Sequence, residues 1–179
     1  MDYILDTIES KTDFAYDLAK KIKCKLPVIV CIGSDRVVSD MIGPLTAEIL
    51  VNKYDVDAYV YGRLQNPITA SNMESAFDYI QNTHKGSQII VVDATVGNIS
   101  DIGKVKFNSC GCIPAGVFSK HTKMYGDISI LPVVSTIGIE SKLFLSCAKF
   151  NTVYKLAKDI AYSIDRAIGI ASYANSLIV

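Results

Sequence analysis

The sequence predicts an α/β protein, a three-layer α/β/α sandwich in which a mostly parallel sheet lies between helices. Two short segments of strand length, 28–32 and 89–92, are wholly apolar, which is typical of parallel strands covered on both faces. Amphipathic segments alternate with them along the chain, and this alternation is the pattern of a layered α/β domain. Because 179 residues are the size of one domain, we expect a single α/β domain over residues 1–179.

The first third of the chain supplies a helix, a strand, a helix and a strand. Apolar residues at helical spacing predict a helix from residue 2 to about residue 24. Pro27 then marks the entry to the strand 28–32. Pro44 suits the first position of an amphipathic helix. Residues 58–61 follow as a second strand.

The middle of the chain repeats this order. Ser71 to Glu74 has the capping-box form S-x-x-E, so we expect a helix to begin at Asn72 and to end at Gly86. The apolar strand 89–92 comes next and ends at Asp93. Residues 104–107 alternate between apolar and charged side chains, which predicts an exposed or edge strand.

The last third is largely helical. Residues 109–126 show no periodicity and are interpreted as a loop. Residues 128–134 form a further strand, and Pro132 within it favours an edge position or a bulge, because proline has no backbone N–H. One helix is expected around 143–147, and apolar residues recurring every three or four positions predict a longer one over about 153–171.

Charge and composition exclude several classes of protein. Lys plus Arg equals Asp plus Glu, 18 against 18, so nothing indicates a nucleic-acid partner or an anionic membrane surface. The first residues are acidic, unlike a signal peptide, and the uncharged C-terminal stretch is too short to span a bilayer. Five cysteines, an odd number without a secretory signal, indicate reduced thiols and a cytoplasmic location.

Recognisable catalytic motifs are missing from the sequence. There is no P-loop, no dinucleotide-binding G-x-G-x-x-G and no nucleophile elbow G-x-S-x-G. Of the two histidines, His84 lies at a predicted helix C-terminus, which favours a structural role, and His121 lies in the irregular loop. Cys110 and Cys112 could hold a soft metal or form a strained disulfide, or could simply be two small residues of a loop.

Two aspartates are the strongest candidates for catalysis. Asp40 stands just ahead of a predicted helix and Asp93 at the end of a strand, so both could face one crevice if the strands 28–32 and 89–93 are neighbours. Two close carboxylates cannot both ionise cheaply, so one keeps its proton while the other can act as a base toward water. The same pair could instead bind a divalent cation, or Asp40 could cap the helix and Asp93 tie down a turn.

Four further residues are candidates for supporting this cleft. Asp35 and Arg36 lie in the loop after the strand 28–32 and could form an ion pair. Thr95 and Asn98 follow Asp93 and could supply hydrogen bonds to a substrate. The irregular loop 109–126 is long for a compact domain, so we expect it to contribute to the same cleft.

Several motifs resemble those of the YyaC-like sporulation protein family, and together they cover roughly residues 28–165. The motif residues are Gly33-Ser34-Asp35-Arg36 with Asp40-Met41-Ile42-Gly43-Pro44, then Val60-Tyr61-Gly62 with Leu64, Pro67, Ala70 and Asn72, then Val92-Asp93-Ala94 with Gly97, and Gly126-Asp127-Ile128-Ser129-Ile130. This family is similar to the germination protease of spore-forming bacteria and, more distantly, to hydrogenase-maturation endopeptidases.

The resemblance implies a phosphorylase/hydrolase-like α/β/α fold and, matched residue by residue, places the acidic residues of both protease groups at Asp40 and Asp93. It implies a sporulation-associated endopeptidase that acts on a protein or peptide substrate, with the aspartate pair activating water. The maturation endopeptidases also use a histidine to bind nickel. Neither His84 nor His121 matches that position, so we expect no metal and no cofactor.

A second hypothesis remains open. The germination protease is about twice as long as this chain, and its substrate-shaping segments have no counterpart here. The alternative is therefore a catalytically inactive binding or regulatory module of the same fold that acts in sporulation. A homo-oligomer is compatible with both hypotheses.

Overall fold

The computed structural model describes residues 1–114, 123–136 and 148–176, and its centre is a seven-stranded mixed sheet. The strand order is β1-β6-β7-β4-β2-β3, and β5 pairs with β7 outside this path. The strands are β1 (Asp2–Ile4), β2 (Val28–Cys31), β3 (Tyr59–Tyr61), β4 (Ile89–Val92), β5 (Thr95–Gly97), β6 (Lys104–Asn108) and β7 (Ile128–Thr136). Both pairings of β6 are antiparallel and all the others are parallel, so the sheet is mostly parallel, as predicted.

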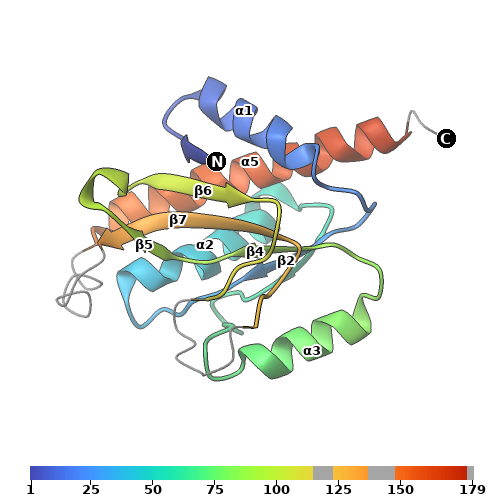
Figure 1. Cartoon of the computed structure of the whole chain (residues 1–179), viewed down its shortest axis with the longest axis horizontal. Coiled ribbons are helices and arrows are strands. Elements are labelled where there is room, and N and C mark those ends of the chain that lie inside the picture. Colours follow the sequence, from blue (N-terminus) through green and yellow to red (C-terminus); the bar gives the residue numbers. More distant parts are fainter. Residues whose placement is uncertain (115–122, 137–147, 177–179) are drawn as a thin grey trace.

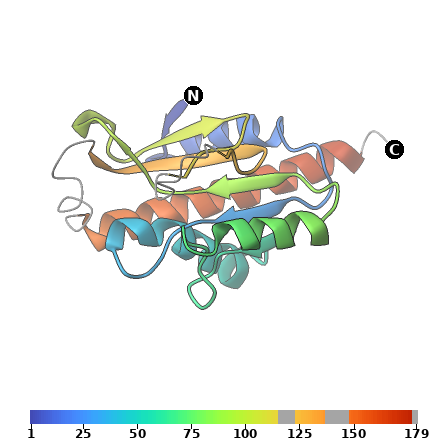
Figure 2. The same ribbon diagram turned by 60° about the horizontal axis from the view of Figure 1, so that its bottom comes forward.

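Helices cover both faces of this sheet, and the three-layer α/β/α sandwich is confirmed (Figures 1 and 2). The longer helices are α1 (Ile8–Ala19), α2 (Ile42–Ile49), α3 (Met73–Thr83) and α5 (Phe150–Ser176). Short helical turns are η1 (Val38–Met41) and η2 (Leu50–Tyr54), which flank α2, and η3 (Ile99–Asp101). α1, α2 and α5 pack on one face and α3 on the other (Figure 1). No helix within the described residues is long and apolar enough to cross a membrane.

The apolar strands β2 and β4 divide the core in two because successive side chains point to opposite faces. Ile29 and Ile90 pack with α1, α2 and α5, while Val30 and Val91 pack with α3. β2 and β4 lie side by side in parallel, in register from Val28–Ile89 to Cys31–Val92, which confirms their predicted adjacency. Both strands therefore end at the same edge of the sheet.

The N-terminal prediction is partly wrong. Residues 2–4 form β1, which pairs with residues 104–106 of β6, and α1 begins only at Ile8. Thr7 is the N-cap, and its hydroxyl accepts a hydrogen bond from the Ser10 N–H at 3.0 Å. Three residues are too few to show a strand period, and the partner that makes them a strand lies about a hundred residues away.

The expected edge positions are also wrong. β1 covers the outer side of β6, and β7 is an inner strand between β6 and β4. The backbone groups of residues 130 and 132 point toward the β4 side of β7, where the Asp93 N–H donates to Ile130 O at 3.2 Å. Pro132 is tolerated because no strand of the described residues needs an N–H from it at its own level. β4 has ended at that level and the pairing of β5 begins only at Val133, with a register shift between Thr95 and Val96. That shift falls between Val133 and Ser135 on β7, beyond Pro132, whose own pairing with Val105 shows no irregularity.

The helix predictions hold with local changes. The N-cap of α3 is Asn72, and Ser71 instead shares a hydrogen bond with the Thr69 hydroxyl at 2.8 Å. Pro44 is the third residue of α2, because η1 supplies a turn before it. The long C-terminal helix is confirmed as α5, with a continuous buried stripe. The helix expected around 143–147 lies outside the described residues.

Candidate active site at the carboxyl edge of the sheet

Two glycines fold the segment after β2 back onto the end of that strand. Gly33 has a φ of +139°, and a Cβ atom there would lie 2.0 Å from the Asp40 carbonyl oxygen. A Cβ atom on Gly43 would lie 2.1 Å from the carbonyl oxygen of Ile32. Only glycine permits both close approaches, since real Cβ atoms do not come within 3.0 Å of such atoms. These two close approaches bring η1, and Asp40 with it, to the carboxyl end of β2.

Asp40 is half-buried and held by a neighbouring side chain. Its Oδ2 accepts a hydrogen bond from the Ser34 hydroxyl at 2.9 Å. The Ser34 N–H also donates to the Asp40 carbonyl oxygen at 3.2 Å, so the two residues are joined twice. Asp40 is not the N-cap of α2, a position taken by Met41. The carboxylate is thus oriented by Ser34 rather than used to start the helix.

Asp93 directly follows β4 and is only 7% exposed. Its N–H donates to Ile130 O, which keeps it in register with β7, and its carboxylate accepts a hydrogen bond from the Ala94 N–H. Burial, and then the negative charge of Asp40, raise the pKa of Asp93 to about 7. Near neutral pH this carboxyl group therefore exchanges readily between its protonated and ionised forms. The negative charge of one predicted aspartate, Asp40, therefore acts on the pKa of the other, Asp93.

Cys112 is a member of this site that the sequence did not single out as one. Burial, and then the negative charge of Asp93, raise the pKa of its thiol to about 12. Backbone hydrogen bonds in both directions with Tyr125, at 3.0 and 2.9 Å, hold it in the core between the sheet and α3. Cys110 and Cys112 are both free cysteines, the first exposed and the second buried. A protonated thiol therefore lies beside the carboxyl group of Asp93.

The other predicted residues lie in the segments that adjoin Asp40 and Asp93 in the chain. Asp35 and Arg36 are exposed in the loop before η1, and no ion pair joins them in the part of the chain that the structure describes. Thr95 is half-buried as the first residue of β5. Asn98 is exposed, and its N–H donates to an Asp101 carboxylate oxygen at 3.3 Å, in the turn of η3.

Neither histidine adds to the site as described. His84 shares a hydrogen bond of 2.7 Å with the Tyr61 hydroxyl and stacks on Tyr59, so it has the predicted structural role. His121 lies outside the described residues. Across residues 1–114, 123–136 and 148–176, no three side chains of His, Cys, Asp or Glu are grouped so as to hold a metal ion.

Comparison with known proteins agrees with this architecture. Residues 6–163 match the model of a family described as "Protein of unknown function (DUF1256)". The chain is 30% identical over 142 residues to "Uncharacterized protein YyaC" of Bacillus subtilis (strain 168), with 79% of this chain and 69% of that protein covered. It is also similar in fold to a crystal structure of the NiFe hydrogenase maturation protease HycI from Thermococcus kodakarensis KOD1, with a TM-score of 0.55 at 18% identity. That match covers 81% of this chain and 93% of the other. The chain therefore belongs to the DUF1256 family, is YyaC-like, and has the α/β fold of a hydrogenase maturation protease.

Proposed function

We propose that this protein is a sporulation-associated, germination-protease-like endopeptidase in which Asp40 and Asp93 activate water. The observation that carries the proposal is the burial of Asp93 against the negative charge of Asp40, with its pKa raised to about 7. A carboxyl group with a pKa near the working pH can both give and accept a proton during one turnover. Structural aspartates have no need of such an environment, and perturbed groups of this kind are frequent at functional sites.

The two carboxyl groups would divide the work of amide hydrolysis. Asp40, fixed by Ser34, takes a proton from water as the water oxygen attacks the peptide carbonyl carbon. The protonated Asp93 gives its proton to the carbonyl oxygen, so a neutral tetrahedral intermediate forms. Asp40 then passes its proton to the nitrogen as the C–N bond breaks, and Asp93 recovers a proton from a hydroxyl group of the intermediate. The pair ends the cycle in the protonation state in which it began.

The fold and the family support this proposal at a coarser level. The similar structure is that of a protein named a maturation protease, and the resemblance in the sequence motifs implies acidic protease residues at Asp40 and Asp93. A sporulation role, a cytoplasmic location and a protein or peptide substrate belong to the same proposal. It includes no metal, cofactor, nucleic acid or membrane partner, and it leaves room for a homo-oligomer.

Cleavage by purified full-length protein tests the proposal. The substrate is a defined mixture of synthetic peptides of ten to fourteen residues, with products identified by mass spectrometry. We expect cleavage near pH 7 by the native protein and a loss of about 10³-fold or more in Asp40→Asn and in Asp93→Asn. Asp13→Asn is the matched control, because this exposed aspartate lies on α1, outside the segments that form the candidate site. Native-like turnover in either of the first two variants would contradict the role assigned to that residue.

The alternative, a catalytically inactive binding or regulatory module, is favoured by one observation. Both carboxylates already have partners within the protein, Ser34 for Asp40 and the Ala94 N–H for Asp93. Such a module would bind peptides without cutting them, and the two Asp→Asn variants would bind as well as the native protein does. Peptide binding measured beside cleavage separates the two functions.

A further inference from the structure

Among residues 1–114, 123–136 and 148–176, no strand pairs with one of the two edges of β5. It pairs with β7 alone, and residues 95–97 make no other backbone hydrogen bond within the described residues. An unpaired edge presents N–H and C=O groups with which a second chain can pair. β5 begins two residues after Asp93, so this free edge starts at the candidate active site.

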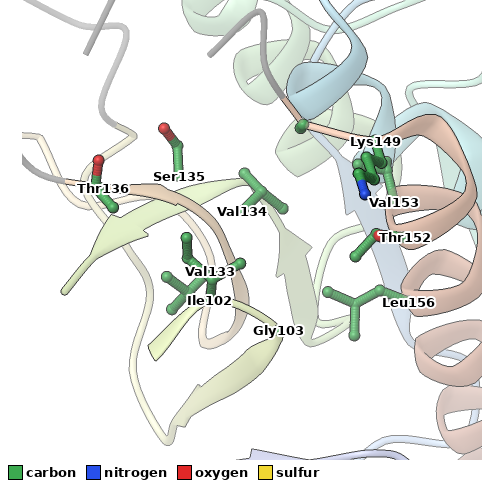
Figure 3. A pocket seen from close by; sticks show the side chains of 11 residues that line it. Ile102, Gly103, Val133, Val134, Ser135, Thr136, Lys149, Thr152, Val153 and Leu156 are labelled. Atoms are coloured by element: carbon green, nitrogen blue, oxygen red, sulfur yellow. The ribbon is translucent and has the colours of Figure 1, made fainter. Parts of the chain in front are cut away.

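A cavity of about 240 Å³ lies between the end of β7 and the first turns of α5 (Figure 3). Its wall is mainly apolar, from Ile102, Val133, Val134, Val153 and Leu156. Val133 is the pairing partner of Thr95, so the cavity is one strand away from the free edge of β5. The cavity is smaller than the roughly 300–1,000 Å³ of pockets that take whole small molecules, and it suits a single side chain.

Ser135 adds an unusual polar group to the wall of this cavity. Its hydroxyl oxygen is buried from solvent and has no hydrogen-bond partner. Leaving such a group unpaired costs stability, and a bound chain that offered it a polar atom would remove that cost. Ser135 pairs with Val96 in the sheet, so its hydroxyl lies close to the strand that carries the free edge.

We propose that the free edge of β5 binds an extended peptide as an added strand, with one apolar side chain of that peptide in the cavity between β7 and α5. The inference rests on the proposed function, because it names how that site would hold its substrate. In strand addition, main-chain hydrogen bonds supply affinity, and pockets for alternate side chains supply specificity. The mainly apolar wall favours an apolar side chain, and Lys149, which also lines the cavity, disfavours a second cation there (Figure 3).

Binding is measured by fluorescence polarisation with full-length Asp93→Asn, which is not expected to cut the probes. The probes are labelled seven-residue peptides that differ only in a central Leu, Ala or Lys, and a Leu peptide whose backbone is N-methylated at alternate residues. We expect the Leu peptide to bind about tenfold or more tightly than the Lys peptide, with Ala between them. N-methylation should weaken binding by a similar factor, because it removes the donors that pair with β5.

Variants at the cavity test its part in this binding. Thr152 is exposed at the rim, so Thr152→Trp should fill the cavity and abolish the preference for Leu, while its exposed neighbour Asn151→Trp should not. Ser135→Ala should weaken peptide binding about threefold to tenfold while leaving the melting temperature unchanged or higher. A purely structural role for that serine would not change binding.

The outcomes separate this inference from the proposed function. Cleavage by the native protein without any preference for Leu, or without an effect of Thr152→Trp, overturns strand and cavity binding alone. Preferential binding of the Leu peptide that depends on Thr152 and on the backbone N–H groups, but without cleavage, supports the inference and overturns the peptidase. Failure of all four probes to bind overturns the inference.

Discussion

Two aspartates at opposite ends of β4 show how differently one residue type is used in this fold. Asp127, at the entry edge, is exposed; its Oδ2 accepts a hydrogen bond from the Ile89 N–H at 2.7 Å, and its own N–H donates to Ile89 O at 2.8 Å. Asp93, at the exit edge, is buried beside the negative charge of Asp40. The first arrangement stabilises the start of a strand, whereas the second holds an unfavourable charge in place.

Position at a strand end is therefore not enough to identify a functional carboxylate. Asp127 keeps access to water and accepts a hydrogen bond from a backbone N–H, so it serves the start of the strand. Asp93 loses water and gains a like charge. The surrounding structure must offset the cost of the ionised form, which is typical of groups retained for chemistry rather than for stability.

The largest expected effect is on the pH dependence of stability. Because the pKa of Asp93 is raised to about 7 in the folded state, from about 4 in the unfolded chain, the folded state binds the extra proton between these values. Ionisation of Asp93 therefore lowers the free energy of unfolding as the pH rises from about 4 to 7, by about 4 kcal/mol at most.

Urea melts of the native protein and Asp93→Asn between pH 4 and pH 8 measure this effect. We expect the stability of the variant, relative to the native protein, to increase with pH across that range and to level off above pH 7. We compare the free energies of unfolding of the two proteins at each pH, because Glu48 adds a pH dependence of the opposite sign to both of them. Arg63 lowers the pKa of Glu48. A difference that does not vary with pH would contradict the description of Asp93 as a strained acid.

Asp127→Ala should have a smaller effect with the opposite sign. The substitution leaves the Ile89 N–H without its side-chain acceptor, so we expect a loss of about 1–2 kcal/mol in the free energy of unfolding at neutral pH. Peptide cleavage should not change, since Asp127 lies at the other end of β4 from the candidate site. Equal behaviour of Asp127→Ala and Asp93→Ala in both assays would remove the contrast between the two edges.

The smallest expected effect concerns Ser34. Its hydroxyl donates to Asp40 at 2.9 Å, so Ser34→Ala should lower kcat/KM about tenfold, because Asp40 loses the group that orients its carboxylate. Ser176→Ala is the control, since that hydroxyl donates to Tyr173 O near the far end of α5. An unchanged kcat/KM in Ser34→Ala would show that the hydrogen bond does not position Asp40 for cleavage.

Much of the architecture was predictable because local sequence encodes which faces are buried. The uninterrupted apolar residues of β2 and β4 predicted parallel inner strands, and the repeat of apolar residues predicted α5. The same reasoning placed Asp40 and Asp93 at one edge, since parallel neighbours end on the same side. Gly33 and Gly43 were noted as motif residues, and the structure explains both by steric contact with backbone oxygens.

Only the tertiary structure decided which segments meet. β1 is a strand because distant β6 pairs with it, and Pro132 occupies an inner strand because β4 ends before that level of the sheet. Cys112 comes under the influence of Asp93 because its segment pairs with Tyr125 in the core between the sheet and α3, a contact that no local pattern encodes. The raised pKa of Asp93 has the same origin, because burial and the approach of Asp40 depend on the whole fold. The sequence by itself determined only that one carboxylate stands ahead of a helix and the other at a strand end.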